Sequence, residues 1–120
     1  MTGENAVLVA DDEAGMRETL VEILEQAGYE VSAAADGDSA LATIRAKPFD
    51  VVVMDIRMPG RDGVSVVREV RHPPPQFILM TAYTHEERIR EALEAKALAV
   101  VSKPFQVRQL LDLVARAGEA

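Results

Sequence analysis

Short apolar runs alternate along this chain with longer segments in which apolar residues recur every three or four positions. The short runs predict strands at about Ala6–Ala10, Glu30–Ala34, Val51–Asp55, Phe77–Thr81 and Leu98–Val101. Strand and helix alternate throughout, which is typical of right-handed βαβ units in one sheet. The first, third and fourth runs are continuously apolar, as expected of strands covered by helices on both faces, and therefore of a parallel sheet. We predict an α/β fold: a doubly wound sheet of five strands.

The segments between and after these runs have helical spacing. Their apolar positions are Met16, Leu20, Ile23, Leu24 and Ala27; Leu41 and Ile44; Val64, Val67 and Val70; Ile89, Ala92 and Leu93; and Leu110, Leu111, Val114 and Ala115. Gly28 is expected to end the first helix, because glycine readily adopts the left-handed conformation found there. Asp36 to Asp38 should open the second helix, and Thr84 should cap the fourth.

Composition narrows the functional classes. The chain has 120 residues, so we expect residues 1–120 to form a single domain. Its net charge of −7 argues against direct binding of nucleic acid. The absence of cysteine excludes disulfides and thiolate chemistry. No signal peptide and no membrane span can be recognised, so we expect a cytoplasmic protein without a membrane partner.

Carboxylates end two of the buried strands. Asp11 and Asp12 follow the first strand, and Asp55 closes the third. Functional groups in such sheets gather beyond the carboxyl ends of the strands, near the switch in winding direction. Thr81 ends the fourth strand and Lys103 follows the fifth, so all five side chains are expected at one edge of the sheet.

This set of groups suits phosphoryl transfer. Carboxylate oxygens in an open cluster favour Mg²⁺, which binds one or two carboxylates together with water and phosphate oxygens. A carboxylate such as Asp55 can attack phosphorus, while a hydroxyl and an ammonium group stabilise the phosphoryl oxygens. His72 and His85 have no zinc-ligand spacing and are expected at the surface.

Each residue also has a simpler interpretation. Asp11 or Asp12 could cap the helix that starts near Glu13, and for the dipeptide alone a cap is the more common role. Asp55 could be a turn residue before Pro59-Gly60. Lys103-Pro104 could be a surface charge followed by a helix-start proline. Independent caps, however, have no reason to fall on one edge of one sheet.

Four sequence blocks resemble the receiver domain of two-component response regulators. They are Val9-Ala10-Asp11-Asp12-Glu13, Val53 to Gly60 with Asp62-Gly63, Met80-Thr81-Ala82, and Lys103-Pro104-Phe105. Their order and spacing cover essentially the whole chain. The resemblance implies the flavodoxin-like version of the fold, with strand order 2-1-3-4-5.

The resemblance also implies a role for each site residue. Asp55 is the expected phosphoacceptor, and Thr81 and Lys103 bind the phosphoryl group. Asp12, Asp55 and the backbone carbonyl of Arg57 are expected to ligate Mg²⁺ directly, with Asp11 acting through water. The Lys103–Pro104 peptide bond is expected to be cis.

The implied partners are those of two-component signalling. The phosphodonor would be a histidine kinase or phosphotransfer protein, with small phosphodonors as substitutes, and the target a separate effector or a fused output domain absent from this chain. A phosphorylation-dependent dimer is compatible with the family. The implied role is regulatory, since such a domain catalyses only its own phosphorylation and dephosphorylation.

One position departs from the family pattern. Receivers carry an aromatic residue three positions before the lysine, and its inward turn alters the surface formed by the fourth helix, fifth strand and fifth helix. Here that residue is Val100, and Lys96 to Ala99 replace a common Gly-Ala-Asp-Asp. Either Val100 is always inward or another element carries the signal. Leu98 and Ala99 could extend an apolar surface, although a buried strand start is the simpler expectation.

Two bulky residues are candidates for setting the lifetime of the phosphoryl group. Arg57 lies two positions after Asp55, and Tyr83 two positions after Thr81. We hypothesise that both restrict the attacking water; alternatively, both simply point to solvent.

Three other functions compete with the signalling receiver. A phosphatase with an aspartyl nucleophile usually has a second acid at the position that Arg57 occupies here, which argues against repeated turnover. Such an enzyme also needs a substrate cap, for which a chain of 120 residues leaves little room. A receiver-like module that no longer needs phosphate is disfavoured by the intact acids, although Val100 is compatible with it. A nucleotide-binding protein is weaker still, because no glycine-rich loop follows the first strand.

Overall fold

The computed structural model describes residues 6–70, 75–82 and 86–119. Its strands are β1 (Ala6–Ala10), β2 (Glu30–Ala34), β3 (Val51–Asp55), β4 (Gln76–Thr81) and β5 (Ala99–Ser102). Its helices are α1 (Ala14–Gln26), α2 (Gly37–Ala46), α3 (Gly63–Glu69), α4 (Glu86–Glu94) and α5 (Val107–Glu119). Strand and helix therefore alternate from one end of the described chain to the other.

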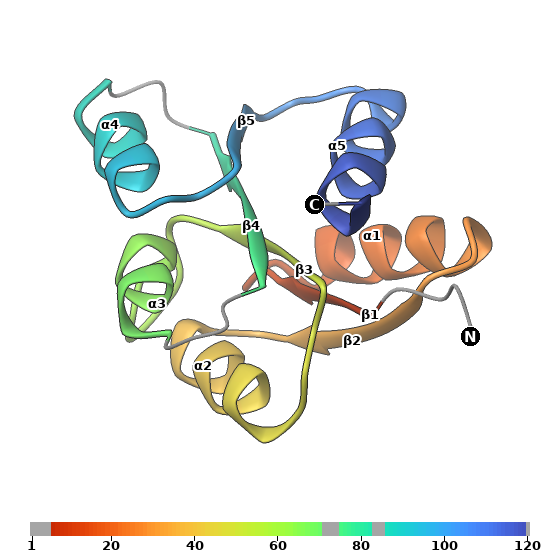
Figure 1. Ribbon diagram of the computed structural model, residues 1–120, viewed down its shortest axis with the longest axis horizontal. Coiled ribbons are helices and arrows are strands. Elements are labelled where there is room, and N and C mark those ends of the chain that lie inside the picture. Colours follow the sequence, from red (N-terminus) through yellow and green to blue (C-terminus); the bar gives the residue numbers. More distant parts are fainter. Residues whose placement is uncertain (1–5, 71–74, 83–85, 120) are drawn as a thin grey trace.

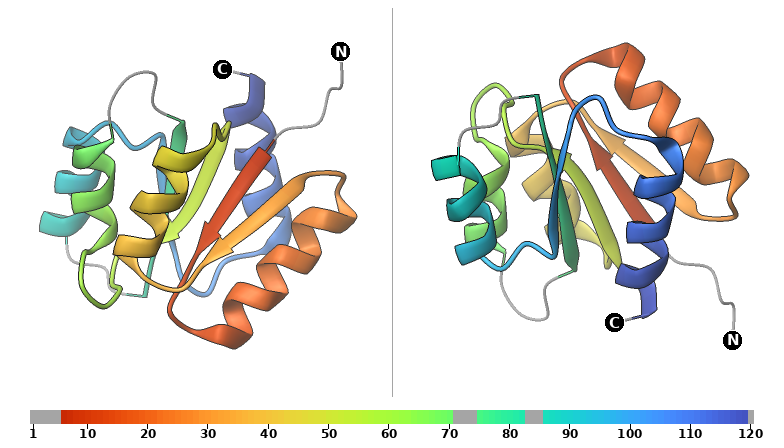
Figure 2. Two further views of the ribbon diagram at one scale, coloured as in Figure 1. Left: turned by 90° about the horizontal axis from the view of Figure 1, so that it is seen from below. Right: turned by 90° about the horizontal axis from the view of Figure 1, so that it is seen from above.

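The strands form one parallel sheet in the order β2-β1-β3-β4-β5. The predicted fold class and strand order are both confirmed. In β1 and β3 the register pairs Ala10 with Met54, so the carboxyl ends of these two strands are side by side. The arrows of β1 and β3 run in the same direction in Figure 2. Residues that end these strands must therefore meet at one edge of the sheet.

Each face of the sheet is covered by its own layer of helices. In Figure 1, α2, α3 and α4 lie on one side of the sheet, and α1 and α5 lie on the other. Side chains alternate between these layers along each strand. In β1, Leu8 packs with the layer of α2, α3 and α4, and Val9 packs with the layer of α1 and α5. This double burial explains why β1, β3 and β4 are almost entirely apolar.

The helix boundaries follow the local signals. Gly28 has a φ of 99°, and α1 ends just before it. The second helix opens within Asp36 to Asp38 as predicted, and the Asp36 carboxylate caps it by accepting a hydrogen bond from the Ser39 backbone N–H at 2.7 Å. Asp62 caps α3 in the same way through Ser65, at 2.9 Å. Thr84, the predicted cap of α4, lies outside the described residues.

Several details of the apolar pattern were predicted wrongly. Ala27, the last apolar position of the first helical segment, and Leu93 in the fourth are both exposed. Ala115 is exposed, and Ala117 instead lies in the core, because α5 presents its buried face through Leu110, Val114 and Ala117. β5 begins at Ala99 and not at Leu98, which is 42% exposed. The chain turns just before it, where Lys96 has a φ of 75°. Within the described residues, no helix combines the length and the apolar character that crossing a membrane requires.

Candidate functional site

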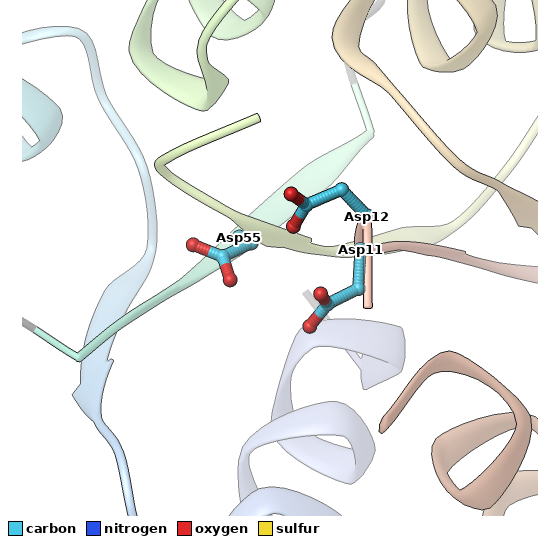
Figure 3. A group of neighbouring side chains, drawn as sticks. All are labelled: Asp11, Asp12 and Asp55. Carbon is cyan, nitrogen blue, oxygen red and sulfur yellow. The ribbon is translucent and has the colours of Figure 1, made fainter. Parts of the chain in front are cut away.

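Three carboxylates converge beyond the carboxyl ends of β1 and β3. Asp11, Asp12 and Asp55 each offer an oxygen that lies within 4.8 Å of the others. Figure 3 shows the three side chains leaving the two strand ends toward a shared space. Asp11 is fully buried, Asp55 is 9% exposed and Asp12 is exposed. The cluster therefore has a closed inner side, formed by Asp11, and an open outer side, formed by Asp12.

Asp11 is held by both of its carboxylate oxygens. Oδ1 accepts a hydrogen bond from the Glu13 backbone N–H at 2.9 Å, and Oδ2 accepts one from the Lys103 ammonium at 3.0 Å. Its backbone carbonyl accepts a further bond from the Arg17 guanidinium at 2.8 Å. The N-cap residue of α1 is Glu13, with no side-chain cap bond, so neither Asp11 nor Asp12 caps that helix. This hydrogen bond of Arg17 could not be predicted, because the helical pattern gives no indication that its side chain reaches the Asp11 backbone.

Asp55 combines a turn contact with an ion pair. Oδ1 accepts a hydrogen bond from the Arg57 backbone N–H at 3.0 Å, which is the local turn role that its position before Pro59-Gly60 suggested. Oδ2 lies 2.7 Å from the Lys103 Nζ. The turn contact uses one oxygen only. The other lies within the cluster, next to a cation.

Lys103 is the internal counter-ion of the cluster. Its side chain is only 14% exposed, so the alternative of a simple surface charge is wrong. Burial by itself would lower the pKa of the Lys103 ammonium, but hydrogen bonds and the charges of Asp55 and Asp11 outweigh this effect and raise the pKa. The ammonium therefore stays charged at neutral pH and offsets part of the repulsion among the carboxylates.

Thr81 and Lys103 are connected through the backbone. Thr81 ends β4 and pairs in register with Ser102 of β5. Its carbonyl accepts a hydrogen bond of 2.7 Å from the backbone N–H of Lys103. Thr81 is buried, at 4% exposure. The Lys103–Pro104 peptide bond is cis, as expected.

The loop from β3 to α3 is tied at its base. The Gly63 backbone N–H donates to the Ile56 carbonyl at 2.7 Å, which closes residues 57–62 into a compact excursion beside Asp55. A Cβ on Gly63 would lie 2.7 Å from the Asp55 carbonyl oxygen. Only glycine fits this contact, which gives the Asp62-Gly63 pair of the sequence a structural reason. Arg57 is exposed at the start of the loop, whereas Tyr83, the other candidate for limiting water access, lies outside the described residues.

The donor set fits a hard divalent cation. The three carboxylates supply only oxygen, and the exposed Asp12 leaves room for the waters that Mg²⁺ retains. His72 and His85, the two histidines of the chain, lie outside the described residues, so their predicted surface position is untested.

Comparison with protein families gives one assignment for nearly the whole chain. Residues 7–115 match the model described as the response regulator receiver domain. The chain belongs to this family. The four sequence blocks are therefore shared with the family through common descent, and the fold is the receiver fold.

Curated relatives agree with the assignment. The chain is 38% identical over 112 residues to the response regulator protein FleR of Pseudomonas aeruginosa, which covers 92% of this chain and 24% of the relative. It is 33% identical over 110 residues to sporulation initiation phosphotransferase F of Bacillus subtilis, covering 90% of this chain and 89% of the relative. Receivers thus occur among these relatives both as part of a longer protein and as nearly the whole protein.

Solved structures give the same result. A CheY-like receiver domain from Methanospirillum hungatei superposes with a TM-score of 0.92 at 28% identity, covering 98% of this chain and 95% of the other. The complex of CheX, CheY, BeF₃ and Mg²⁺ from Borrelia burgdorferi contains a chain with a TM-score of 0.86 at 25% identity, covering 93% of this chain and 87% of the other.

Proposed function

We propose that Asp55 of this receiver accepts a phosphoryl group from a histidine kinase or phosphotransfer protein in a Mg²⁺-dependent reaction. The observation that carries the proposal is the placement of the Lys103 ammonium, 2.7 Å from Asp55 Oδ2 and 3.0 Å from Asp11 Oδ2, beside a third carboxylate from Asp12. A cation in this position can pair with an anion that arrives on Asp55.

The reaction begins with attack by an Asp55 carboxylate oxygen on phosphorus. The oxygen–phosphorus bond forms as the phosphorus–nitrogen bond of the donor histidine breaks, and the bonding pair leaves with the imidazole nitrogen, which takes up a proton. Transition-state charge gathers on the phosphoryl oxygens, where Lys103 and the Thr81 hydroxyl would stabilise it. Bound Mg²⁺ would supply further neutralisation of charge, held by Asp12, Asp55 and the Arg57 carbonyl, with Asp11 acting through water.

The role proposed for the site is regulatory. Position 57 carries an exposed arginine, so it offers no carboxylic acid to drive repeated turnover of phosphate esters. One phosphoryl group per molecule, later lost to water, is the expected cycle. We place this cycle in the cytoplasm, because the kinase that supplies it uses ATP.

The signal would leave through the surface of α4, β5 and α5. Three large apolar side chains are exposed in this part of the chain: Leu93 at 50%, Leu98 at 42% and Val107 at 45%. Val100 is partly buried against the core layer of α2, α3 and α4, which favours the inward alternative for this residue. With no ring at position 100, backbone movement from Thr81 through the paired Ser102 is the proposed route to that surface.

The partners follow from the same assignment. The chain spans about a quarter to a half of the length of several curated relatives, so a fused output domain is one proposed target and a separate effector the other. A dimer formed on phosphorylation would use the exposed Leu93 and Leu98.

Acetyl phosphate with Mg²⁺ tests the reaction directly. Intact mass should show one added phosphoryl group, which disappears in Asp55→Asn and on chelation of the metal. Beryllium fluoride, which mimics the phosphoryl group, should shift the amide resonances of Thr81, Leu98 and Val100. Repeated hydrolysis of small phosphate esters would instead indicate an enzyme, and partner binding that ignores Asp55→Asn would indicate a phosphate-independent module.

A further inference from the structure

The loop that follows Asp55 is fastened at its tip as well as at its base. Its tip consists of Gly60 and Arg61, where the Arg61 backbone N–H donates to the Pro59 carbonyl at 3.0 Å and Gly60 has a φ of 79°. The N-terminal turn of α2, from a distant part of the sequence, lies directly against this tip. None of the roles proposed for phosphoryl transfer uses this contact.

Gly37, the first residue of α2, makes the approach of the two segments close. A Cβ at this position would overlap the Arg61 carbonyl oxygen and lie 2.6 Å from the Arg61 carbonyl carbon. These are backbone atoms, so no side-chain rotation could relieve the overlap. The φ of Gly37 lies outside the left-handed region, so glycine is required here by space and not by conformation.

Charged side chains add a second set of contacts at the same place. The Arg61 guanidinium lies 3.1 Å from Asp38 of α2 and 3.8 Å from Glu69 of α3. A Cβ on Gly60 would lie 2.9 Å from the same Asp38 carboxylate. Arg61 thus connects the loop to both helices that flank it.

We propose that Gly37, Asp38 and Arg61 are positioning residues that fix the loop after Asp55 and thereby set the affinity of the acidic cluster for Mg²⁺. The loop carries the Arg57 peptide, whose N–H bonds Asp55 and whose carbonyl is a proposed metal ligand. With the base closed by Gly63 and the tip seated on α2, the Arg57 peptide has little freedom. The inference deepens the proposed function and rests on it for the role of the metal.

Arg61→Gln has two opposite effects on the affinity for Mg²⁺, one through the loss of a positive charge and one through the release of the loop. Removing a positive charge near a cation site would strengthen Mg²⁺ binding by electrostatics alone. Releasing the loop would weaken it, because the free loop must lose conformational freedom when the metal binds. An exposed ion pair is worth at most about 1 kcal/mol, so we expect weakening of about threefold.

Gly37→Ala tests the backbone contact. We expect weakening of Mg²⁺ binding by about tenfold, since the added methyl group must displace either the loop or the start of α2. Gly15→Ala in α1 is the matched control, because a Cβ there meets nothing within 4 Å. Arg45→Gln is the matched charge control, since Arg45 pairs with the same Glu69 at 3.7 Å but lies in α2. Both controls should change affinity by less than about twofold.

Two readouts do not depend on phosphorylation. Calorimetric titration with Mg²⁺ gives the affinity, and hydrogen exchange of the Arg57 amide in metal-free protein reports the freedom of the loop. Gly37→Ala and Arg61→Gln should both weaken binding and accelerate this exchange, while leaving the exchange of β1 amides unchanged. At saturating Mg²⁺ the rate of phosphorylation should return to within about twofold of the unmodified protein.

The outcomes separate this proposal from the proposed function. Wild-type affinity and exchange in both variants, or tighter binding by Arg61→Gln, would overturn the positioning role. If Gly37→Ala does not fold, Arg61→Gln decides, because loss of its charge alone would strengthen binding; its double variant with Asp38→Asn should be no weaker than the poorer single variant. Failure of the unmodified protein to be phosphorylated would overturn the proposed function, yet would leave the loop measurements interpretable.

Discussion

Lys103 shows how one residue can stabilise a fold and prepare it for a reaction. Its ammonium lies between two carboxylates that would otherwise repel each other beneath the surface. Removing one member of a buried ion cluster leaves charge without compensation, which costs more than the cluster contributes as a whole. The same cation is the proposed partner of the phosphoryl group.

Replacing Lys103 should therefore expose this double role. We expect Lys103→Met to lower the free energy of unfolding by about 1–3 kcal/mol in metal-free buffer, and Mg²⁺ to stabilise the variant more than the unmodified protein. Urea unfolding with and without Mg²⁺ measures both effects.

A surface lysine supplies the control. Lys47 lies 5.2 Å above the Phe49 ring, and Lys47→Met removes the same charge at a cost below about 1 kcal/mol. Equal losses in the two variants, or an equal benefit from Mg²⁺, would contradict the role of Lys103 as an internal counter-ion.

The adjacent acids Asp11 and Asp12 mark the limit of prediction at this scale. Their position at a strand end was sufficient to predict a shared edge with Asp55, and only the resemblance to receiver domains gave the two acids different roles. In the structure one is fully buried and the other exposed. The difference arises from hydrogen bonds with Glu13 and Lys103, and no local pattern contains the second of these contacts.

The stability of helix α2 depends on contacts in its first turn. Asp36 caps the helix. The hydrogen bond that its carboxylate accepts from the Ser39 backbone N–H lowers the pKa of the Asp36 carboxyl. Because the folded-state pKa lies below the unfolded value near 3.8, the cap contributes stability above that pH. The contribution is lost as the pH falls through the lower, folded-state pKa.

Asp36→Ala should therefore lower the melting temperature near neutral pH, and the difference from the unmodified protein should shrink as the pH falls below 3.8. Asp36→Ser, which keeps a cap oxygen without a titrating group, should retain most of the stability both near neutral pH and in acid. Thermal unfolding followed by circular dichroism measures the series. A difference that is constant with pH would show that the charge of Asp36 is not involved.

Element boundaries were predicted well where the signal is local. Gly28 and Asp36 act through their own backbone conformation and hydrogen bonds, so their neighbours in sequence suffice. The start of β5 was predicted one residue early, because Leu98 is apolar yet 42% exposed. The contact between Arg61 and Gly37 could not be predicted, since it requires the loop from β3 to α3 to meet the first turn of α2, which is distant in the sequence.

For the whole molecule, the family assignment and the observed topology agree with the pattern of apolar runs. Burial on both faces made β1, β3 and β4 unambiguous, and this pattern alone was enough to predict a parallel sheet. The order of the strands came from the resemblance to a family and not from periodicity. Leu93 of α4, Leu98 just before β5 and Val107 of α5 are exposed. The apolar pattern suggested such a surface at Leu98 only as an alternative, because exposure depends on what the complete fold leaves uncovered.

The exposed apolar surface leads to a prediction about assembly. If Leu93 and Leu98 form a contact made on phosphorylation, beryllium fluoride should increase the molecular mass measured by sedimentation, and Leu98→Glu should abolish the increase. Val107→Glu tests whether the contact extends onto α5. An activated protein that stays monomeric would leave these residues as a surface for a different partner.

We expect the two halves of the site to differ in mobility, because their strands occupy different positions in the sheet. Asp11 and Asp12 follow β1 and Asp55 ends β3, two strands with a neighbour on each side, whereas Lys103 follows β5, a four-residue strand at the edge. Amides of central strands exchange with solvent only when the whole molecule unfolds, and those of edges open locally. We expect Val53 to exchange far more slowly than Val101. The carboxylate that reacts would thus stay still, while the strand that responds to it remains free to shift.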